Sequence, residues 1–168
     1  MAKFYVGKGL DRYITALESL QRMSPHICGM AVYEGAKVIA DAVAHNADSL
    51  PVVQARRVKS GDPVLGGVTQ SQKEGLLSSE KGGGLGISKM RNDGGFYNVK
   101  LGYHGYNSTK TEKYPNGQPN VMIARSLERG TSFRQKIPFI SRAVSSKRAT
   151  AERKMAQVVD EETAKIMK

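Results

Sequence analysis

Apolar residues recur three or four positions apart near the start of the chain. This spacing predicts an amphipathic helix over about 10–23, carried by Leu10, Tyr13, Ile14, Leu17 and Leu20. Ser24 and Pro25 then predict a break and a new start, because Ser caps helices well and Pro suits the first helical position. The second helix is expected over about 25–47. Its broad face consists mostly of small side chains, which permit close packing: Ile27, Ala31, Val32, Gly35, Val38, Ile39, Ala42 and Val43.

Periodicity fails from Asp48 to Glu74, where Pro and Gly interrupt the chain. A structureless loop of this length is uncommon inside a compact domain. We therefore expect the segment to be packed against something else. Its apolar residues are the expected anchors: Val52, Val53, Val64, Leu65 and Val68.

Short alternating segments follow this loop. Leu85 and Ile87 alternate with small neighbours, the run 92–95 (Asn-Asp-Gly-Gly) is a turn signal, and the stretch 97–103 alternates cleanly. This pattern predicts a hairpin. A second polar loop is expected over about 104–120, then a strand over 121–127, and a final long helix from Pro138.

The order of elements predicts one α+β domain over residues 1–168. We expect a small antiparallel β-sheet packed against two N-terminal helices and a long C-terminal helix. Two long loops, at about 48–74 and 104–120, complete the fold.

The net charge of +11 is concentrated in the middle of the chain. Residues 1–50 carry five Lys or Arg and five Asp or Glu, and residues 151–168 carry four of each. Residues 51–150 carry 17 cations against 6 anions, scattered among Gly, Ser and Asn. This balance favours nucleic acid or an acidic protein surface as a partner.

A nucleic-acid-binding protein is the alternative function that this charge supports. Such a protein places aromatic rings among cations on one sheet face. Tyr97, Tyr103, Tyr106 and Tyr114, with the nearby lysines and Arg91, come partway to that pattern. Tyr97 and Tyr103 share their predicted face with Val99 and Leu101, however, which favours a place in the core.

No catalytic or cofactor motif emerges, so we expect a protein that is not an enzyme and holds no cofactor or metal. The Gly run at 82–86 leads into a predicted strand, and the glycine-bounded stretch 61–67 lacks the Lys and Ser/Thr of a phosphate loop. His26 and Cys28 lie two apart and point to different sides of a helix, while His45 and His104 are isolated.

The compartment follows from two further observations. The start of the sequence carries no apolar run suited to a signal peptide, and no later run approaches membrane-spanning length. One cysteine excludes an internal disulfide framework and fits a reducing compartment. We expect the cytoplasm during synthesis and no membrane partner.

The stretch 127–139 combines a turn, cations and a helix start. Gly130 is expected to adopt a positive φ, and Pro138 with Phe139 to open the final helix at a fixed angle. Arg129, Arg134 and Lys136 are then expected to be exposed at a subunit edge, the alternative being solvated loop charges. Arg56, Arg57 and Lys59 are expected to contribute to the same kind of interface.

Several segments together resemble the tail-completion (head–tail joining, neck) family of long-tailed bacteriophages. They include the start at 6–11, the helix around 34–39, and the segment 74–79, which is similar to the family's Gly-x-Leu-x-x-Ser approach to its first strand. Strongest is 127–132 (Leu-Glu-Arg-Gly-Thr-Ser), followed by 137–143 (Ile-Pro-Phe-Ile-Ser-Arg-Ala). The family usually shows Glu-x-Gly-Thr, a short linker, and an Arg-Pro-Phe-Leu-x-x-Ala helix start. Ile137 stands where that Arg commonly precedes the Pro.

The resemblance implies a structural virion protein rather than a catalyst. Copies form a ring, six-fold in the family pattern, between the head-side adaptor, head-completion or portal complex and the tail terminator or tail tube. Genomic DNA passes through the lumen without sequence-specific binding. The expected location is the virion neck at the head–tail interface, and the host cytoplasm during assembly.

Overall fold

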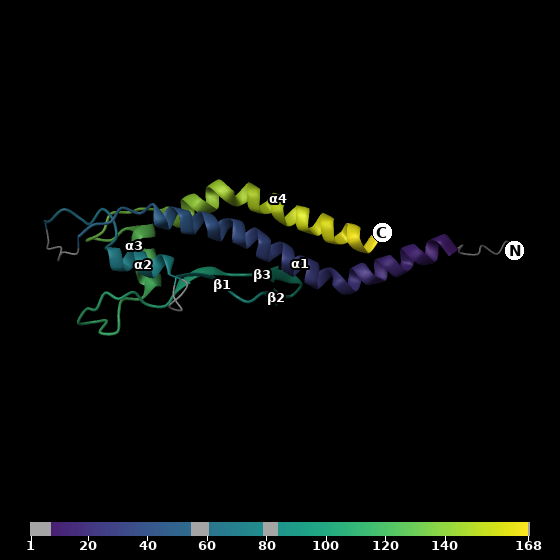
Figure 1. The fold of residues 1–168 in the computed structure, drawn as a ribbon, viewed down its shortest axis with the longest axis horizontal. Helices are drawn as coiled ribbons and strands as arrows, with labels where there is room; N and C mark the ends of the chain where they lie inside the picture. Colours follow the sequence, from purple (N-terminus) through teal and green to yellow (C-terminus); the bar gives the residue numbers. More distant parts are fainter. Residues whose placement is uncertain (1–7, 55–60, 79–83, 168) are drawn as a thin grey trace.

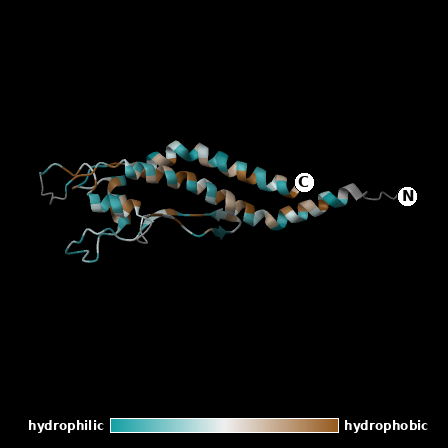
Figure 2. Cartoon of the chain, in the orientation of Figure 1, coloured by the Kyte–Doolittle hydropathy of each residue, from teal (hydrophilic) through white to brown (hydrophobic). Residues whose placement is uncertain are grey.

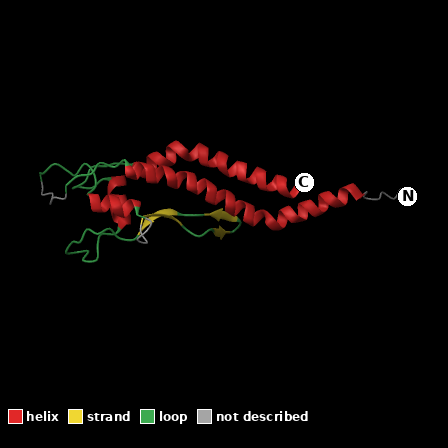
Figure 3. Cartoon of the chain, viewed as in Figure 1, coloured by secondary structure: helices red, strands yellow, loops and turns green. Residues whose placement is uncertain are grey.

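Two long helices lie side by side and antiparallel in the computed structural model of the chain, which describes residues 8–54, 61–78 and 84–167 (Figure 1). They are α1 (Lys8–Asp48) and α4 (Phe139–Met167). Two short helices, α2 (Gln70–Leu77) and α3 (Asn120–Arg129), lie at the end where α4 begins. Figure 3 shows that helices form most of the drawn chain and that the arrow-drawn strands belong to one hairpin.

The predicted hairpin is confirmed. β1 (Gly84–Ile87) pairs antiparallel with β4 (Leu101–His104), and β2 (Arg91–Asp93) pairs with β3 (Phe96–Asn98). The turn uses Gly94 and Gly95, whose φ angles of 65° and 96° are readily available to glycine. The single strand expected over 97–103 is interrupted between β3 and β4, so the hairpin forms two two-stranded sheets. The α+β class is confirmed.

The expected pair of N-terminal helices is wrong, because α1 continues through Pro25 as one helix. A proline inside a helix removes one backbone hydrogen bond and crowds the carbonyl four residues earlier. It therefore bends a helix without always ending it. Figure 1 shows that α1 changes direction part-way along its length, and Pro25 supplies the physical reason.

The small side chains of α1 allow α4 to approach closely, as the sequence predicted. A Cβ atom added at Gly35 would lie 2.5 Å from Cγ of Met155 and 3.5 Å from the carbonyl oxygen of Ala151. A side chain at this position would therefore force the Met155 side chain to move. Figure 2 shows apolar residues recurring along both helices among polar ones. The buried apolar residues of this pair are Ile27, Ala31, Val43, Ala47, Phe139, Ala143, Ala151 and Val158.

The hairpin lies along α1 and is tied to it by one tyrosine. The hydroxyl of Tyr33 donates to the carbonyl of Ser88 at 3.1 Å and accepts the N–H of Met90 at 3.0 Å. Met90 also fills the space beside Gly29, where an added Cβ would lie 2.8 Å from its sulfur. These contacts set the hairpin against the middle of α1 (Figure 1).

The strand expected over 121–127 is wrong, because these residues belong to α3. Alternation of Val121, Ile123 and Leu127 suggested a strand face. In the helix, Leu127 is 0% exposed and packs in the core, whereas Val121 is 54% exposed. The spacing of the buried residues is helical and matches i, i+3, i+4 and i+7: Asn120, Ile123, Ala124 and Leu127.

The first predicted loop ends earlier than expected, because α2 begins at Gln70. Thr69 caps this helix in a capping box: its hydroxyl accepts the N–H of Gln72, and the Gln72 side chain accepts the N–H of Thr69, each at 3.3 Å. Of the expected loop anchors, Val68 is fully buried but Val52 and Val64 are 49% and 43% exposed. The second loop, between β4 and α3, lies where it was predicted.

A matched pair of substitutions tests the assignment of α3. Leu127→Ala should lower the free energy of unfolding by about 2–5 kcal/mol, because it leaves a cavity in the core. Val121→Ala should change it by about 0.5 kcal/mol or less, since that side chain is largely exposed. Urea unfolding followed by circular dichroism measures both. Equal losses for the two variants would contradict the helix and favour a strand in which both side chains share one face.

Candidate assembly interface

The joint, residues 127–139, reverses the chain between α3 and α4 through a carboxylate cap. The two carboxylate oxygens of Glu128 accept the N–H groups of Ile140 and Ser141, each at 3.0 Å, and the Ser141 hydroxyl also contacts Glu128. An anion at a helix N-terminus satisfies free N–H groups and interacts favourably with the helix dipole. Glu128 thus fixes the start of α4 relative to the end of α3.

Gly130 has the positive φ that the sequence predicted. It ends α3 with φ 75° and ψ 166°, and its N–H donates to the carbonyl of Ser126 at 2.9 Å. This backbone region is essentially restricted to glycine. A Cβ at this position would also lie 3.1 Å from Cβ of Lys136, so the residue serves both the turn and the close approach of the returning chain.

The predicted helix start at Pro138 and Phe139 is also confirmed. The carbonyl of Pro138 accepts the N–H of Arg142 at 3.2 Å, and α4 begins at Phe139. The Phe139 side chain is buried, with its ring centroid 6.0 Å from that of Tyr103. The Asn46 side chain of α1 donates to the Phe139 carbonyl at 2.9 Å. The joint is therefore anchored to both α1 and the hairpin.

Two of the three cations expected at the joint are exposed. Arg129 and Lys136 have exposed side chains, and neither forms an ion pair with any residue that the structure describes. Between them Thr131 and Arg134 exchange two backbone hydrogen bonds, which close a tight turn with Phe133 near its tip. Arg56, Arg57 and Lys59, the other expected interface cations, lie outside the described residues.

The expected exposure of Arg134 is wrong, because its side chain is only 4% exposed. The backbone on either side of it pairs with Leu65, and an extended segment alternates its side chains between two faces. Phe133 and Gln135 consequently point outward and Arg134 points inward. Nothing in the sequence marked this position, since Arg is rarely buried.

Inside the fold, Arg134 is incompletely paired. Its Nη2 group donates to Oε1 of Gln72 at 2.9 Å, while Nε and Nη1 have no hydrogen-bond partner among the described residues. Burial lowers the pKa of this guanidinium, because desolvation disfavours the charged form. Gln72 donates in turn to Oε1 of Gln118 at 2.9 Å, so a polar chain links the joint to α2 and the second loop.

The second loop is held on α2 by hydroxyl groups. The Ser71 and Ser108 hydroxyls lie 2.7 Å apart, and the Thr109 hydroxyl donates to Ser71 at 3.1 Å. The Asn120 side chain donates to the carbonyl of His104 at 3.0 Å where the loop begins. Its polar sequence therefore reflects specific contacts with α2 and β4.

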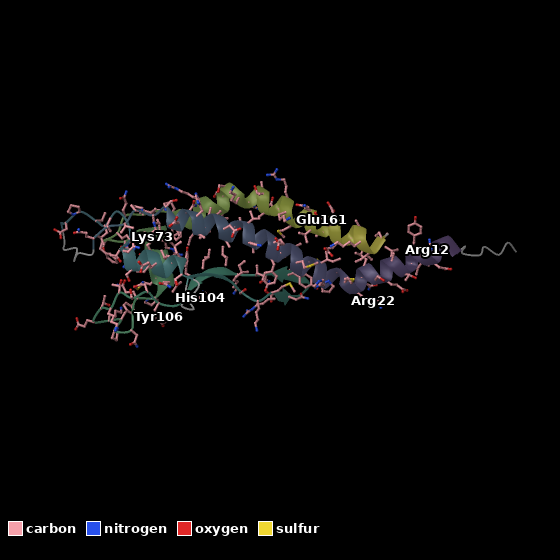
Figure 4. All side chains as sticks on the ribbon, viewed as in Figure 1. Arg12, Arg22, Lys73, His104, Tyr106 and Glu161 are labelled. Carbon is pink, nitrogen blue, oxygen red and sulfur yellow. The ribbon has the colours of Figure 1, made fainter. Side chains whose placement is uncertain are left out.

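The arm, residues 11–23 of α1, projects beyond the end of α4 (Figure 1). Tyr13, Ile14 and Leu17 are 63%, 46% and 56% exposed, although their spacing predicted the apolar face of a packed helix. Figure 4 shows Arg12 and Arg22 on the same projecting segment. Periodicity identified the apolar stripe, but no signal in the sequence showed that the stripe lies outside the core.

A cavity of about 810 Å³ lies between the arm and the last turn of α4. Tyr13, Ala16 and Ser19 line it from the arm, and Ile166 and Met167 line it from α4. Ile14 and Leu17 of the apolar stripe are not among the lining residues, so most of the stripe lies outside this cavity.

Chemistry-bearing side chains do not gather in the part of the chain that the structure describes. Within 8–54, 61–78 and 84–167, no group of three or more His, Cys, Asp or Glu side chains could hold a metal ion. Over the same ranges, no helix has both the length and the apolar character that crossing a bilayer requires. Comparisons of the chain with protein-family models, curated proteins and solved structures find no match.

Removal of the Glu128 charge should weaken the joint. Glu128→Gln should lower the free energy of unfolding by about 1 kcal/mol, since a neutral amide accepts two helix N–H groups less strongly than a carboxylate does. Glu152→Gln is the matched control, because Glu152 pairs only with Arg148 on the exposed surface of α4 and should cost little. Thermal unfolding of both variants provides the measurement. A loss of stability in Glu128→Gln that is no larger than the loss in Glu152→Gln would contradict the cap.

A side chain at Gly130 should strain the turn. Gly130→Ala should destabilise the fold by about 1–3 kcal/mol, because alanine rarely adopts this backbone conformation and its Cβ crowds Lys136. The control is Gly102→Ala in β4, where an added Cβ meets nothing within 4 Å and φ is not positive. Denaturant unfolding distinguishes the two, and wild-type stability of Gly130→Ala would count against the turn.

Proposed function

We propose that this chain is a structural protein of the neck of a long-tailed bacteriophage virion. Copies form a ring, with six subunits in the family pattern, which completes the tail and joins it to the head-side connector. Its neighbours are a head-side adaptor, head-completion or portal protein on one side and a tail terminator or tail tube protein on the other. Genomic DNA passes through the lumen without sequence-specific binding, and no reaction is catalysed.

The observation that carries this proposal is the uncovered arm. The thirteen helical residues of the arm span roughly 20 Å, and Tyr13, Ile14 and Leu17 on this segment are 63%, 46% and 56% exposed. An exposed apolar stripe on such a helix favours a protein partner. A ring supplies that partner from the next copy, since each subunit offers two different surfaces in a heterologous interface.

The joint gives independent support. The residues that carry the resemblance, Glu128 with Gly130 and Pro138 with Phe139, have defined physical roles as the helix cap, the glycine turn and the start of α4. A motif that specifies a rigid change of chain direction suits a subunit whose surfaces must meet at a fixed angle. The exposed Arg129 and Lys136 on this joint suit an acidic protein neighbour.

Nucleic acid, duplex or single-stranded, is the alternative partner for a chain of net charge +11. Tyr97 lies in β3 and Tyr103 in β4, which belong to different two-stranded sheets, so these tyrosines do not share one sheet face as a single-strand platform requires. Tyr103 is part of the core cluster with Phe139, and burial raises the pKa of its hydroxyl. The assembly proposal therefore remains our conclusion, and DNA binding serves as a contrary outcome.

A charge placed on the apolar stripe should abolish assembly without unfolding the subunit. Leu17→Glu should weaken self-association or binding to the neck neighbours at least tenfold, because it places a carboxylate where about 1.5–3 kcal/mol of leucine burial is expected. Arg22→Glu places a carboxylate on the arm away from the apolar stripe and outside the cavity lining, and should leave association nearly unchanged. Native mass spectrometry with purified neck proteins measures both.

Imaging of intact particles tests the proposed location of the protein in the virion. Cryo-electron microscopy should find the chain as a ring between capsid and tail. Its absence there, or a monomer that binds DNA with affinity falling steeply as salt rises, would contradict the proposed function.

A further inference from the structure

An acidic groove lies between α1, α4 and the hairpin, toward the C-terminal end of α4. It is a cavity of about 530 Å³ with an apolar floor that includes Met30, Met90 and Val158. Glu34 of α1 and Glu161 and Glu162 of α4 contribute carboxylates, against one lining lysine, Lys154. The chain as a whole has a net charge of +11, so the charge of this groove is opposite in sign to that of the whole chain.

The carboxylates of the groove are only partly compensated within the subunit. Glu162 pairs with Lys165, whereas Glu161 accepts a hydrogen bond from the neutral Gln157 side chain at 2.6 Å. Glu34 forms no ion pair with any residue among 8–54, 61–78 and 84–167. The groove can therefore accept cations from outside the subunit.

The exposed part of the joint has the complementary composition. Arg129 and Lys136 flank the tight turn that carries Phe133, which is 47% exposed. Aromatic residues next to cations are typical of the anchors that contribute most to protein interfaces. A phenylalanine ring also packs favourably against methionine sulfur, and the groove has two methionines in its lining.

The groove and the joint cannot meet within one subunit. Val158 lies about five helical turns beyond the start of α4, which places the two surfaces roughly 28 Å apart along the axis. Figure 4 shows Glu161 toward the C-terminal end of α4, well away from Lys73 on α2 beside the joint. Any contact between these surfaces must therefore join two copies.

We propose that the joint of one copy docks in the acidic groove of the next copy, head to tail. Phe133 enters the apolar floor, while Arg129 and Lys136 face Glu34 and Glu161 at the rim. This inference rests on the proposed ring and specifies which surfaces form it. Because the two surfaces differ, the contact is heterologous, and its repetition closes into a ring when the rotation permits. The arm lies at the groove end, where it can hold the incoming subunit.

Charge reversal tests the contact. A joint variant (Arg129→Glu with Lys136→Glu) and a groove variant (Glu34→Lys with Glu161→Lys) should each weaken self-association at least tenfold, because like charges then face one another. All four substitutions in one chain should restore most of the association. An equimolar mixture of the joint and groove variants should also assemble, since either joint then meets a groove of opposite charge. Sedimentation velocity at several concentrations gives the dissociation constants.

Two further variants test whether the effect belongs to the proposed contact. Arg148→Glu with Glu152→Lys exchanges an exposed ion pair on α4 outside both surfaces and should leave association unchanged. Phe133→Ala removes the aromatic anchor without a charge change and should weaken association at least tenfold. Circular dichroism and thermal unfolding check that each variant keeps the fold.

The possible outcomes separate this contact from the proposed function. Three results would overturn the contact. The joint or groove variant could form rings as well as the wild type, or the losses of association could add in the four-substitution chain. The third is a wild-type chain that stays monomeric. If rings that are unaffected by the joint and groove substitutions still occupy the neck of particles, the function stands and the contact fails. If restored association occurs in solution but the chain is absent from the neck, the contact stands and the function fails.

Discussion

The close packing of α1 against α4 is the constraint on which the other features of the structure depend. Gly35 and the alanines on its face bring the two backbones near each other, and Met155 fills the space that a larger residue would occupy. The hairpin then lies along α1 through Tyr33 and Met90, and the short helices cover the end where α4 begins. A wider helix pair would separate the core side chains that these elements share.

The joint makes this helix pair possible, because it returns the chain to the start of α4 in a fixed direction. Glu128 binds the free N–H groups of α4, Gly130 supplies a backbone conformation that other residues rarely adopt, and Phe139 anchors the helix start in the core. The same geometry turns Arg134 inward and leaves Arg129, Phe133 and Lys136 outside. The turn between α3 and α4 thus also produces an aromatic and basic surface, which the proposed head-to-tail contact uses.

The two ends of the subunit differ in the way that a heterologous assembly requires. One end carries the uncovered arm and the acidic groove, and the other carries the joint and the second loop. Apolar burial on the arm would supply most of the association energy, while exposed charges contribute orientation, being worth about 0–1 kcal/mol per pair. Under the proposed function, this division suits a ring whose subunits must be both firmly held and correctly directed around a DNA-filled lumen.

Local chemistry in the sequence determined the hairpin, the glycine turn, the start of α4 and the α+β class, because turn residues and helix starts act within a few positions. Tertiary structure decided the rest. Pro25 bends α1 without ending it, the apolar residues of α3 alternate like a strand but pack as a helix, and Arg134 is buried although arginine usually is not. The sequence also identified the apolar stripe of the arm, but it did not show that the stripe is exposed. Periodicity shows which residues share a face, but only the packed fold determines what covers that face.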